Sequence, residues 1–173
     1  YGLSKNELMA FHRPRLNLLS NSGADFFAFE TIPSRIEAQA IHDLLREFPQ
    51  HKGWISFSFK SQTETCGCNQ LTDCINDLKD SDQLVALGAN CTDPKLITPI
   101  VNSIRTLTEK AIVVYPNSGE LYDAETKEWS GSSTSEFSPR DWFEAGASII
   151  GGCCRTGPKD VEKIRRQLAD CIT

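Results

Sequence analysis

Apolar and polar residues follow one another along the chain in blocks that predict strands separated by helices. Five nearly continuous apolar runs have the length of buried strands, and they cover residues 24–31, 54–59, 84–91, 111–117 and 147–154. Their starts lie about 30 residues apart, which is the length of a strand–helix–strand unit. Strands that are apolar throughout are typical of a parallel sheet covered by helices. The pattern therefore predicts an α/β protein built from repeated βα units.

The segments between these runs carry signals for the start of a helix. Ser34 followed by Glu37 predicts a capping box, and a second box, Ser4 with Glu7, stands at the front of the chain. A third N-cap is expected at Ser138, because a proline follows it at the first helical position. Two apolar stripes at helical spacing are expected to face the sheet, made by Ile36, Ala40, Ile41, Leu44, Leu45 and Phe48, and by Val161, Ile164, Leu168 and Ile172.

A parallel βα pattern is compatible with a doubly wound open sheet or with a (βα)8 TIM barrel. No predicted strand is followed by a GxGxxG or GxxxxGK[ST] loop, which disfavours a nucleotide-binding open sheet. A complete barrel has eight strands and typically about 250 residues, whereas this chain has 173 residues. We therefore expect residues 1–173 to form the C-terminal portion of a single barrel domain.

Composition narrows the possible partners. The chain has 18 basic and 23 acidic residues and a net charge of −5, which disfavours binding to a nucleic-acid backbone. No apolar run approaches the length of a membrane span, and no signal-peptide pattern opens the chain. Seven cysteines cannot all pair with one another, so reduced thiols are expected. These features predict a cytoplasmic enzyme with neither a nucleic-acid nor a membrane partner.

Two of the predicted strands end in cysteine, one at Cys91 and the other at Cys153 and Cys154. One strand separates them along the chain, so their carboxyl ends should lie about 10 Å apart in a parallel sheet. Catalytic groups of a barrel lie at these ends, and inward-leaning thiolates can span that gap to a zinc ion. Gly151 and Gly152 are expected to free the backbone so that both following sulfurs face one point. Three ligands would leave the fourth position of a tetrahedral zinc open, as in catalytic sites.

Other interpretations of these cysteines remain open at this stage. Each thiol could simply be buried in the core, or the segment GGCCRTG could hold a phosphate with Arg155. A nucleophilic Cys153 paired with a histidine is disfavoured, because His12 and His42 fall in predicted helices and His51 precedes a strand.

A second group of cysteines, Cys66, Cys68 and Cys74, also invites a metal interpretation. Their spacing, C-x-C-x5-C, matches no zinc template well. We expect them to be loop and helix thiols.

Four segments of the chain, FAFETIPS, GANC, YPNSGE and GGCCRT in this order, closely resemble the zinc-dependent homocysteine S-methyltransferases. The likeness is strongest to the branch that uses S-methylmethionine, and it covers essentially all 173 residues. The pairing of NC with GGCCRT is highly specific. The resemblance implies a (βα)8 barrel in which the five predicted strands are the fourth to the eighth.

The resemblance also implies an activity and a set of site residues. Zinc would be held by Cys91, Cys153 and Cys154, and a methyl group would pass from S-methylmethionine or S-adenosylmethionine to the homocysteine thiolate, giving methionine. Glu30 would bind the amino group of homocysteine, and Asn117 would help to line the pocket. From the residues alone, an ion pair between Glu30 and a barrel arginine, for example Arg155, is an equal alternative, since a carboxylate that ends an apolar strand needs a partner.

Two alternatives to a methyltransferase are compatible with the sequence. The chain could be a truncated, inactive zinc-binding or interaction protein with the same half-barrel, its exposed sheet edge covered by a partner. A barrel lyase or aldolase is disfavoured, because Lys60 follows a strand without a phosphate-binding companion.

Overall fold

The computed structural model describes residues 2–123, 125–131, 137–169 and 171. Its helices are α1 (Lys5–Leu19), α2 (Arg35–Leu45), α3 (Leu71–Asn76), the 3-10 helix η1 (Pro94–Leu96), α4 (Ile97–Arg105), α5 (Pro139–Glu144) and α6 (Pro158–Ala169). Its strands are β1 (Phe26–Ile32), β2 (Lys52–Phe57), β3 (Leu84–Asn90), β4 (Ala111–Tyr115), β5 (Leu121–Asp123), β6 (Glu128–Ser130) and β7 (Ala147–Ile150).

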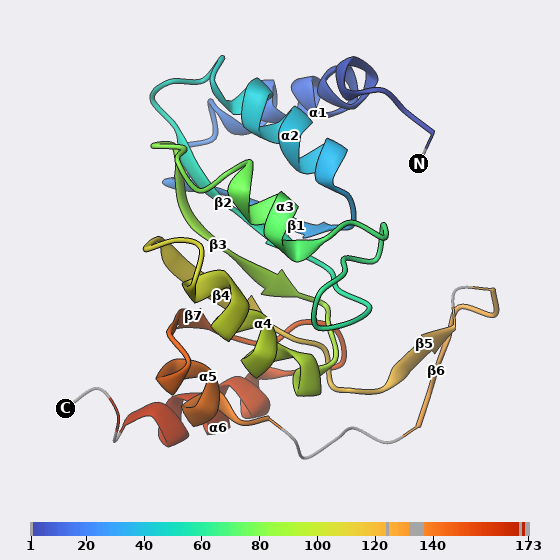
Figure 1. Ribbon diagram of the computed structural model, residues 1–173, viewed down its shortest axis with the longest axis vertical. Coiled ribbons are helices and arrows are strands. Elements are labelled where there is room, and N and C mark those ends of the chain that lie inside the picture. The colour runs from blue at the N-terminus through green and yellow to red at the C-terminus, as the bar shows by residue number, and fades with distance from the viewer. Residues whose placement is uncertain (1, 124, 132–136, 170, 172–173) are drawn as a thin grey trace.

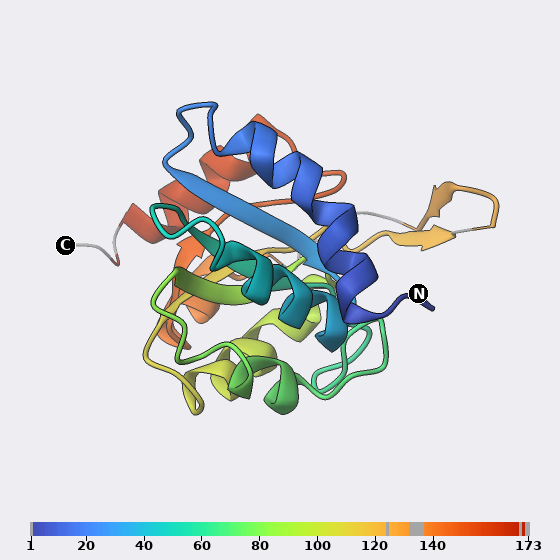
Figure 2. The same ribbon diagram turned by 90° about the horizontal axis from the view of Figure 1, so that it is seen from above.

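The five predicted strands form one parallel sheet in the order β1-β2-β3-β4-β7 (Figures 1 and 2). This order follows the chain, and a helix lies between each strand and the next, so the prediction of repeated βα units is confirmed. Strand β7 ends at Ile150, earlier than the predicted run, which leaves Cys153 and Cys154 in the loop beyond it. Strands β1 and β7 are the two edges of the described sheet.

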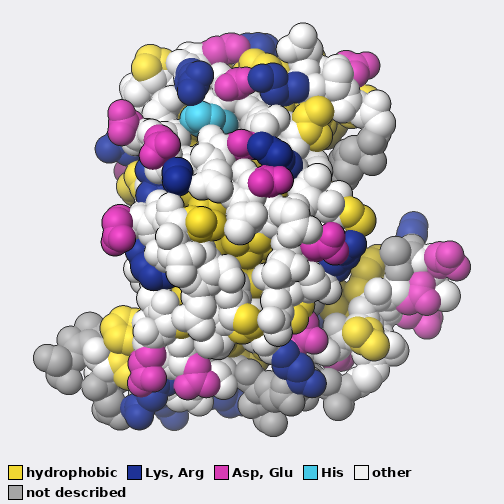
Figure 3. Space-filling view, in the orientation of Figure 1, with side chains coloured by type: hydrophobic (Ala, Val, Ile, Leu, Met, Phe, Trp, Pro, Cys, Tyr) yellow, Lys and Arg dark blue, Asp and Glu magenta, His cyan; other side chains and the backbone are white. Residues whose placement is uncertain are grey.

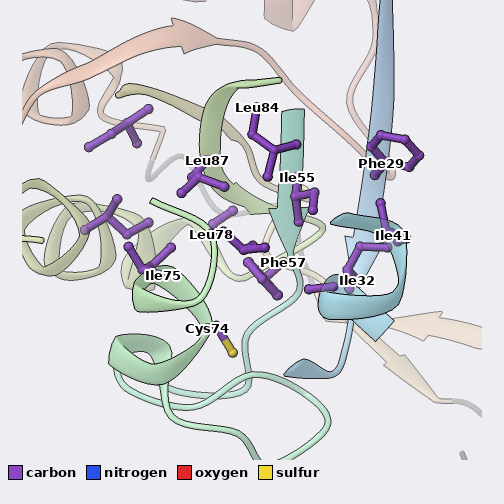
Figure 4. Close-up of a cluster of buried hydrophobic side chains, with 14 of the residues drawn as sticks. Phe29, Ile32, Ile41, Ile55, Phe57, Cys74, Ile75, Leu78, Leu84 and Leu87 are labelled. Atoms are coloured by element: carbon purple, nitrogen blue, oxygen red, sulfur yellow. The ribbon is translucent and has the colours of Figure 1, made fainter. Parts of the chain in front are cut away.

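The core lies between the sheet and the helices. Phe27 and Phe29 of β1 are buried on the helical side, whereas Phe26, Ala28 and Glu30 alternate with them and are exposed on the opposite face. Figure 4 shows the buried side chains of neighbouring strands meeting those of α2 and α3. Burial of such side chains is the main stabilising term of the fold. The opposite face of the sheet carries polar side chains, Glu30 among them, and a functional site can form on this face.

Helix α1 begins as predicted, but α2 does not. The Glu7 backbone N–H donates to Ser4 Oγ at 3.4 Å, and Glu7 Oε2 accepts from the Ser4 backbone N–H at 2.8 Å, so this capping box is confirmed. The capping box predicted at Ser34 is wrong, because its side chain makes no capping hydrogen bond. Glu37 instead lies beside His12 of α1, with 3.0 Å between Glu37 Oε1 and His12 Nε2. Because α1 packs on α2, the Glu37 carboxylate contacts His12 instead of forming the capping box with Ser34.

The remaining helix predictions are confirmed in part. Pro139 opens α5, but Ser138 makes no capping hydrogen bond, since its ψ of 65° is not the extended backbone of an N-cap residue. Ile36 and Val161 are 39% and 45% exposed, while the other described members of their stripes are buried. Both lie in the first turn of their helices, so the buried part of each stripe begins one turn later. Ile172 lies outside the described residues.

The surface carries a small hairpin and mixed charges. Strands β5 and β6 pair antiparallel and project from the sheet after β4 (Figure 1). Acidic and basic side chains are interspersed on the helical face (Figure 3). Within the described ranges, no helix has the length and apolar character needed to cross a bilayer.

Candidate metal centre

Three sulfur atoms converge at the carboxyl ends of β3 and β7. The Sγ atoms of Cys91 and Cys154 are 3.4 Å apart, and those of Cys153 and Cys154 are 3.9 Å apart. All three lie within 4.8 Å of one another and form what we call the three-cysteine cluster. It is the only group of three or more His, Cys, Asp and Glu ligand atoms this close together among the described residues, and it contains no histidine.

Strand β4, which lies between β3 and β7, fixes both parts of the cluster. The Cys91 backbone N–H donates to the Tyr115 carbonyl at 3.1 Å, and the Cys153 backbone N–H donates to the Pro116 carbonyl at 2.8 Å. Cys91 has a φ of 49°, which turns the chain sharply where β3 ends. The sulfurs therefore meet across the end of β4, the strand that the sequence analysis placed between them.

The cluster favours a bound cation electrostatically. A hydrogen bond from Cys91 is the main cause that lowers the pKa of Cys153 to about 6, and further hydrogen bonds from Cys154 and Asn90 contribute. The pKa of Cys91 is raised, because its thiol donates to Cys153 and is partly buried. The hydrogen bonds within the cluster therefore favour the thiolate form of Cys153 over that of Cys91.

The sulfur separations fit a tetrahedral metal ion. A zinc–sulfur bond of about 2.3 Å places the sulfurs of a tetrahedral site about 3.8 Å apart. The observed separations of 3.4 and 3.9 Å lie on either side of that value. Thiolates are soft ligands that select zinc over hard cations. Three protein ligands also leave one position open for a further sulfur.

Gly152, one of the two glycines before the cluster, is needed because a larger residue would not fit there. The backbone leaves regular strand geometry at Gly151 and Gly152, as predicted, but neither is among the described glycines with a positive φ, so left-handed backbone is not what they supply. A Cβ on Gly152 would clash with Thr156 Oγ1 and would lie 2.9 Å from Thr156 Cβ. Thr156 Oγ1 donates to the Cys153 carbonyl at 2.6 Å. Gly152 therefore lets the threonine pack against the backbone that carries the cluster.

We expect Gly152→Ala to weaken zinc binding about 10-fold in a chelator competition, the range seen when a group that orients a metal ligand is disturbed. The added methyl would push Thr156 away from the Cys153 carbonyl. Gly151→Ala is the matched control, because its Cβ would make only an ordinary contact with Tyr115 Cβ at 3.6 Å. Equal zinc affinity in the two variants would contradict this explanation.

Glu30, the predicted substrate residue, lies on the exposed face of the sheet at the carboxyl end of β1. Burial raises the pKa of Tyr115 to about 12, and the nearby Glu30 carboxylate adds to that rise. The alternative ion pair with Arg155 is wrong, because Arg155 binds Glu120 through two hydrogen bonds of 3.0 and 3.1 Å. Because the Arg155 guanidinium is paired with Glu120, it is also not available to bind a phosphate at the GGCCRTG segment.

Asn117, the other predicted substrate residue, lies two residues beyond β4. Its backbone N–H donates to the Thr92 carbonyl at 3.1 Å, and its Oδ1 accepts from the Gly119 backbone N–H at 2.9 Å. These contacts hold the turn that follows β4 beside the residue next to Cys91. A pocket-lining role for Asn117 stays a prediction.

The second group of cysteines does not join the cluster. Cys74 is 1% exposed within the core (Figure 4), and burial raises its pKa to about 12. Cys66 and Cys68 are exposed in the loop after β2, where Lys60 Nζ lies 3.1 Å from Cys68 Sγ. These are loop and helix thiols, as expected.

A buried polar network beside the cluster was missed by the sequence analysis. Asn90 is completely buried and hydrogen-bonds to Thr31 and Ser56, and Ser56 Oγ lies 2.7 Å from the Tyr115 hydroxyl. Trp54 Nε1 donates to the same hydroxyl at 3.3 Å. The available signal in the sequence is the asparagine of GANC, a polar residue at the end of an apolar strand.

Fold and cluster together define an α/β protein with three cysteines, at the ends of parallel strands, that could hold a metal ion. The family model of the homocysteine S-methyltransferases matches residues 1–168. The chain belongs to this family.

Two known relatives are named homocysteine S-methyltransferases, and a third is a selenocysteine methyltransferase. Homocysteine S-methyltransferase YbgG of Bacillus subtilis is 46% identical over 167 residues, which is 95% of this chain and 53% of that protein. Homocysteine S-methyltransferase 2 of Arabidopsis thaliana is 42% identical over 174 residues, 97% of this chain and 52% of that protein. Selenocysteine Se-methyltransferase of Brassica oleracea var. italica is 42% identical over 167 residues, 93% of this chain and 48% of that protein. The chain spans about half the length of these relatives.

Solved structures agree with the fold. The metallated form of the homocysteine methyltransferase MmuM from Escherichia coli matches with a TM-score of 0.82 and 35% identity, covering 96% of this chain and 53% of that one. Its apo form matches with a TM-score of 0.81 and 35% identity, covering 96% and 58%. The predicted (βα)8 barrel class is confirmed, with the present chain supplying five consecutive βα units.

Proposed function

We propose that the protein carrying this chain is a zinc-dependent homocysteine S-methyltransferase, which moves a methyl group from S-methylmethionine or S-adenosylmethionine to homocysteine and releases methionine. The observation that carries the proposal is the three-cysteine cluster, found at the strand ends of a chain that belongs to this family. Residues 1–173 would be the C-terminal portion of a single barrel domain, since the chain spans about half of its relatives. The seven free cysteines support a reducing, cytoplasmic location.

The chain's own residues would bind and orient the acceptor. Cys91, Cys153 and Cys154 would hold the zinc, which supplies the means to keep the homocysteine sulfur deprotonated at neutral pH. Glu30, on the same exposed face, would bind the α-ammonium group and fix the other end of the amino acid. Asn117 would close the side of the pocket after β4.

The donor would need no general base from the chain. A sulfonium compound is positively charged, and in-line transfer of its methyl group neutralises it while the acceptor thiolate loses its charge. Orientation of the two reactants then supplies much of the acceleration. Homocysteine would be bound at two points, its sulfur at the three-cysteine cluster and its ammonium group at Glu30, and this would align the sulfur with the methyl group of the donor.

The test is methionine formation by the full-length, zinc-loaded protein with homocysteine and each sulfonium donor in turn. We expect activity with both donors to be measurable and kcat/KM to be higher for S-methylmethionine, the donor of the branch it resembles. No methionine from either donor would contradict the proposed function. A higher kcat/KM for S-adenosylmethionine would contradict only the choice of donor.

A further inference from the structure

Asn90 joins two parts of the site that are far apart in the sequence. It is the last residue of β3, is completely buried, and precedes Cys91 directly. Its Oδ1 accepts from the Thr31 backbone N–H at 2.7 Å and from Ser56 Oγ at 2.8 Å. Its Nδ2 lies 2.7 Å from Thr31 Oγ1 and 3.9 Å from Cys153 Sγ. All four hydrogen-bonding positions of the side-chain amide are therefore used.

The orientation of this amide is set by its partners. A backbone N–H can only donate, so the Asn90 atom that faces the Thr31 N–H must be the oxygen. The Nδ2 group then faces Thr31 Oγ1 with one hydrogen and the Cys153 sulfur with the other. Rotating the amide by 180° would place an N–H against the Thr31 N–H and would remove the N–H that faces the Cys153 sulfur. The buried network thus aims an N–H at one sulfur of the cluster.

The other end of the network holds the strand that carries Glu30. Phe29 pairs with Ile55 and Ile32 pairs with Phe57, so β1 has one extra residue between these pairs and forms a bulge. Thr31 lies in this bulge with a φ of 59°, a conformation that is strained for a β-branched residue. Asn90 accepts one hydrogen bond from the Thr31 backbone N–H and donates another to the Thr31 hydroxyl, and this pair of bonds holds the conformation of Thr31 and, with it, the direction of the neighbouring Glu30.

We propose that Asn90 is a positioning residue that couples the two anchoring points of the acceptor: it orients the Cys153 sulfur through an N–H, and it orients Glu30 through the Thr31 bulge. The link to Glu30 rests on the proposed function, whereas the link to Cys153 does not. Outer groups that hydrogen-bond to metal ligands commonly change metal affinity by 10- to 100-fold. Asn90 would act on the sulfur and on the carboxylate at once.

The link to Cys153 is tested with zinc alone, by chelator competition on the full-length protein. Asn90→Asp keeps the size of the side chain but turns a carboxylate oxygen toward the sulfur, so zinc affinity should fall about 10- to 100-fold. Ser56→Ala, the control, removes another hydrogen bond of Asn90 and leaves its N–H groups in place, so zinc should bind as in the wild type. Wild-type affinity in Asn90→Asp would overturn this half of the proposal.

The link to Glu30 is tested by the KM for homocysteine at saturating zinc. Asn90→Asp still offers an oxygen to the Thr31 N–H and can accept from the Thr31 hydroxyl, so its KM should stay near the wild-type value. Asn90→Ala removes both contacts and should raise KM about 10-fold, in line with losing hydrogen bonds that hold a binding group. A merely structural role would lower the melting temperature of both variants without separating their KM values.

An unchanged KM in Asn90→Ala would overturn the link to Glu30. Asn90→Ser, which keeps a polar group in this buried position, is the second variant should Asn90→Ala fail to fold. If the zinc-loaded wild type formed no methionine, the proposed function would fail, and the zinc competition would still decide the contact between Asn90 and Cys153.

Discussion

Replacing Cys153 by alanine should reduce the zinc content of the protein from about one ion per site to nearly none. Zinc held by four ligands has an apparent binding free energy of about 10–16 kcal/mol, or about 3 kcal/mol for each ligand. Loss of one thiolate should therefore weaken binding by at least about 100-fold. Cys153 supplies one of the three sulfurs of the cluster, and its backbone is held in place by a hydrogen bond from its N–H to the Pro116 carbonyl. Methyl transfer should be lost together with the metal.

The measurement is metal analysis of protein purified under reducing conditions, since neighbouring thiols without metal can oxidise. The matched control is Cys68→Ala, which removes an exposed thiol outside the three-cysteine cluster and should leave zinc content unchanged. A triple variant with Cys91, Cys153 and Cys154 all replaced by alanine should bind no zinc. Full zinc content in that variant would mean that the metal is held elsewhere.

The strands and the cysteines could be predicted from the sequence because both depend on short-range patterns. A nearly continuous apolar run is enough to indicate a parallel strand. Parallel strands also end at the same edge of a sheet, so the sequence alone is enough to place Cys91 beside the pair at 153 and 154. Sulfur separations of 3.4 and 3.9 Å show how near that placement was.

The errors arose where a side chain had a choice between local and distant partners. Ser34 and Glu37 have the spacing of a capping box, but the carboxylate lies beside His12 of another helix. The need for a glycine at position 152 likewise depends on a contact that the local sequence does not show. Only the folded loop shows that Thr156 occupies the space a side chain would need.

The sequence shows a polar residue, Asn90, at the end of an apolar strand, but the partners of Asn90 could not be derived from it. Its partners Thr31, Ser56 and Cys153 lie 59, 34 and 63 residues away along the chain. The bulge that brings Thr31 within hydrogen-bonding distance of Asn90 depends on the pairing of β1 with β2, and no residue pattern in β1 predicts this bulge. Long-range register, rather than residue type, decides this part of the site.

Glu30→Gln should raise the KM for homocysteine and lower kcat/KM by about 100-fold in the full-length enzyme. The substitution keeps the shape of the side chain and removes its charge. A charge-assisted hydrogen bond of roughly 1.5–3 kcal/mol to the substrate ammonium would be lost, and this corresponds to about 10- to 150-fold in kcat/KM. Zinc content should not change, because the three-cysteine cluster does not include Glu30.

A structural readout accompanies the kinetic one. The Glu30 carboxylate contributes to the raised pKa of Tyr115, so removing its charge should let the phenol ionise at a lower pH than about 12 in an ultraviolet titration. The control is Glu64→Gln, which neutralises a carboxylate paired with Lys60 in the loop after β2 and should leave the homocysteine KM unchanged. If Glu30→Gln lost its zinc, or unfolded more easily while binding homocysteine normally, Glu30 would be a structural residue. An elevated KM with intact zinc and a lowered tyrosine pKa would instead place the carboxylate at the ammonium end of the acceptor.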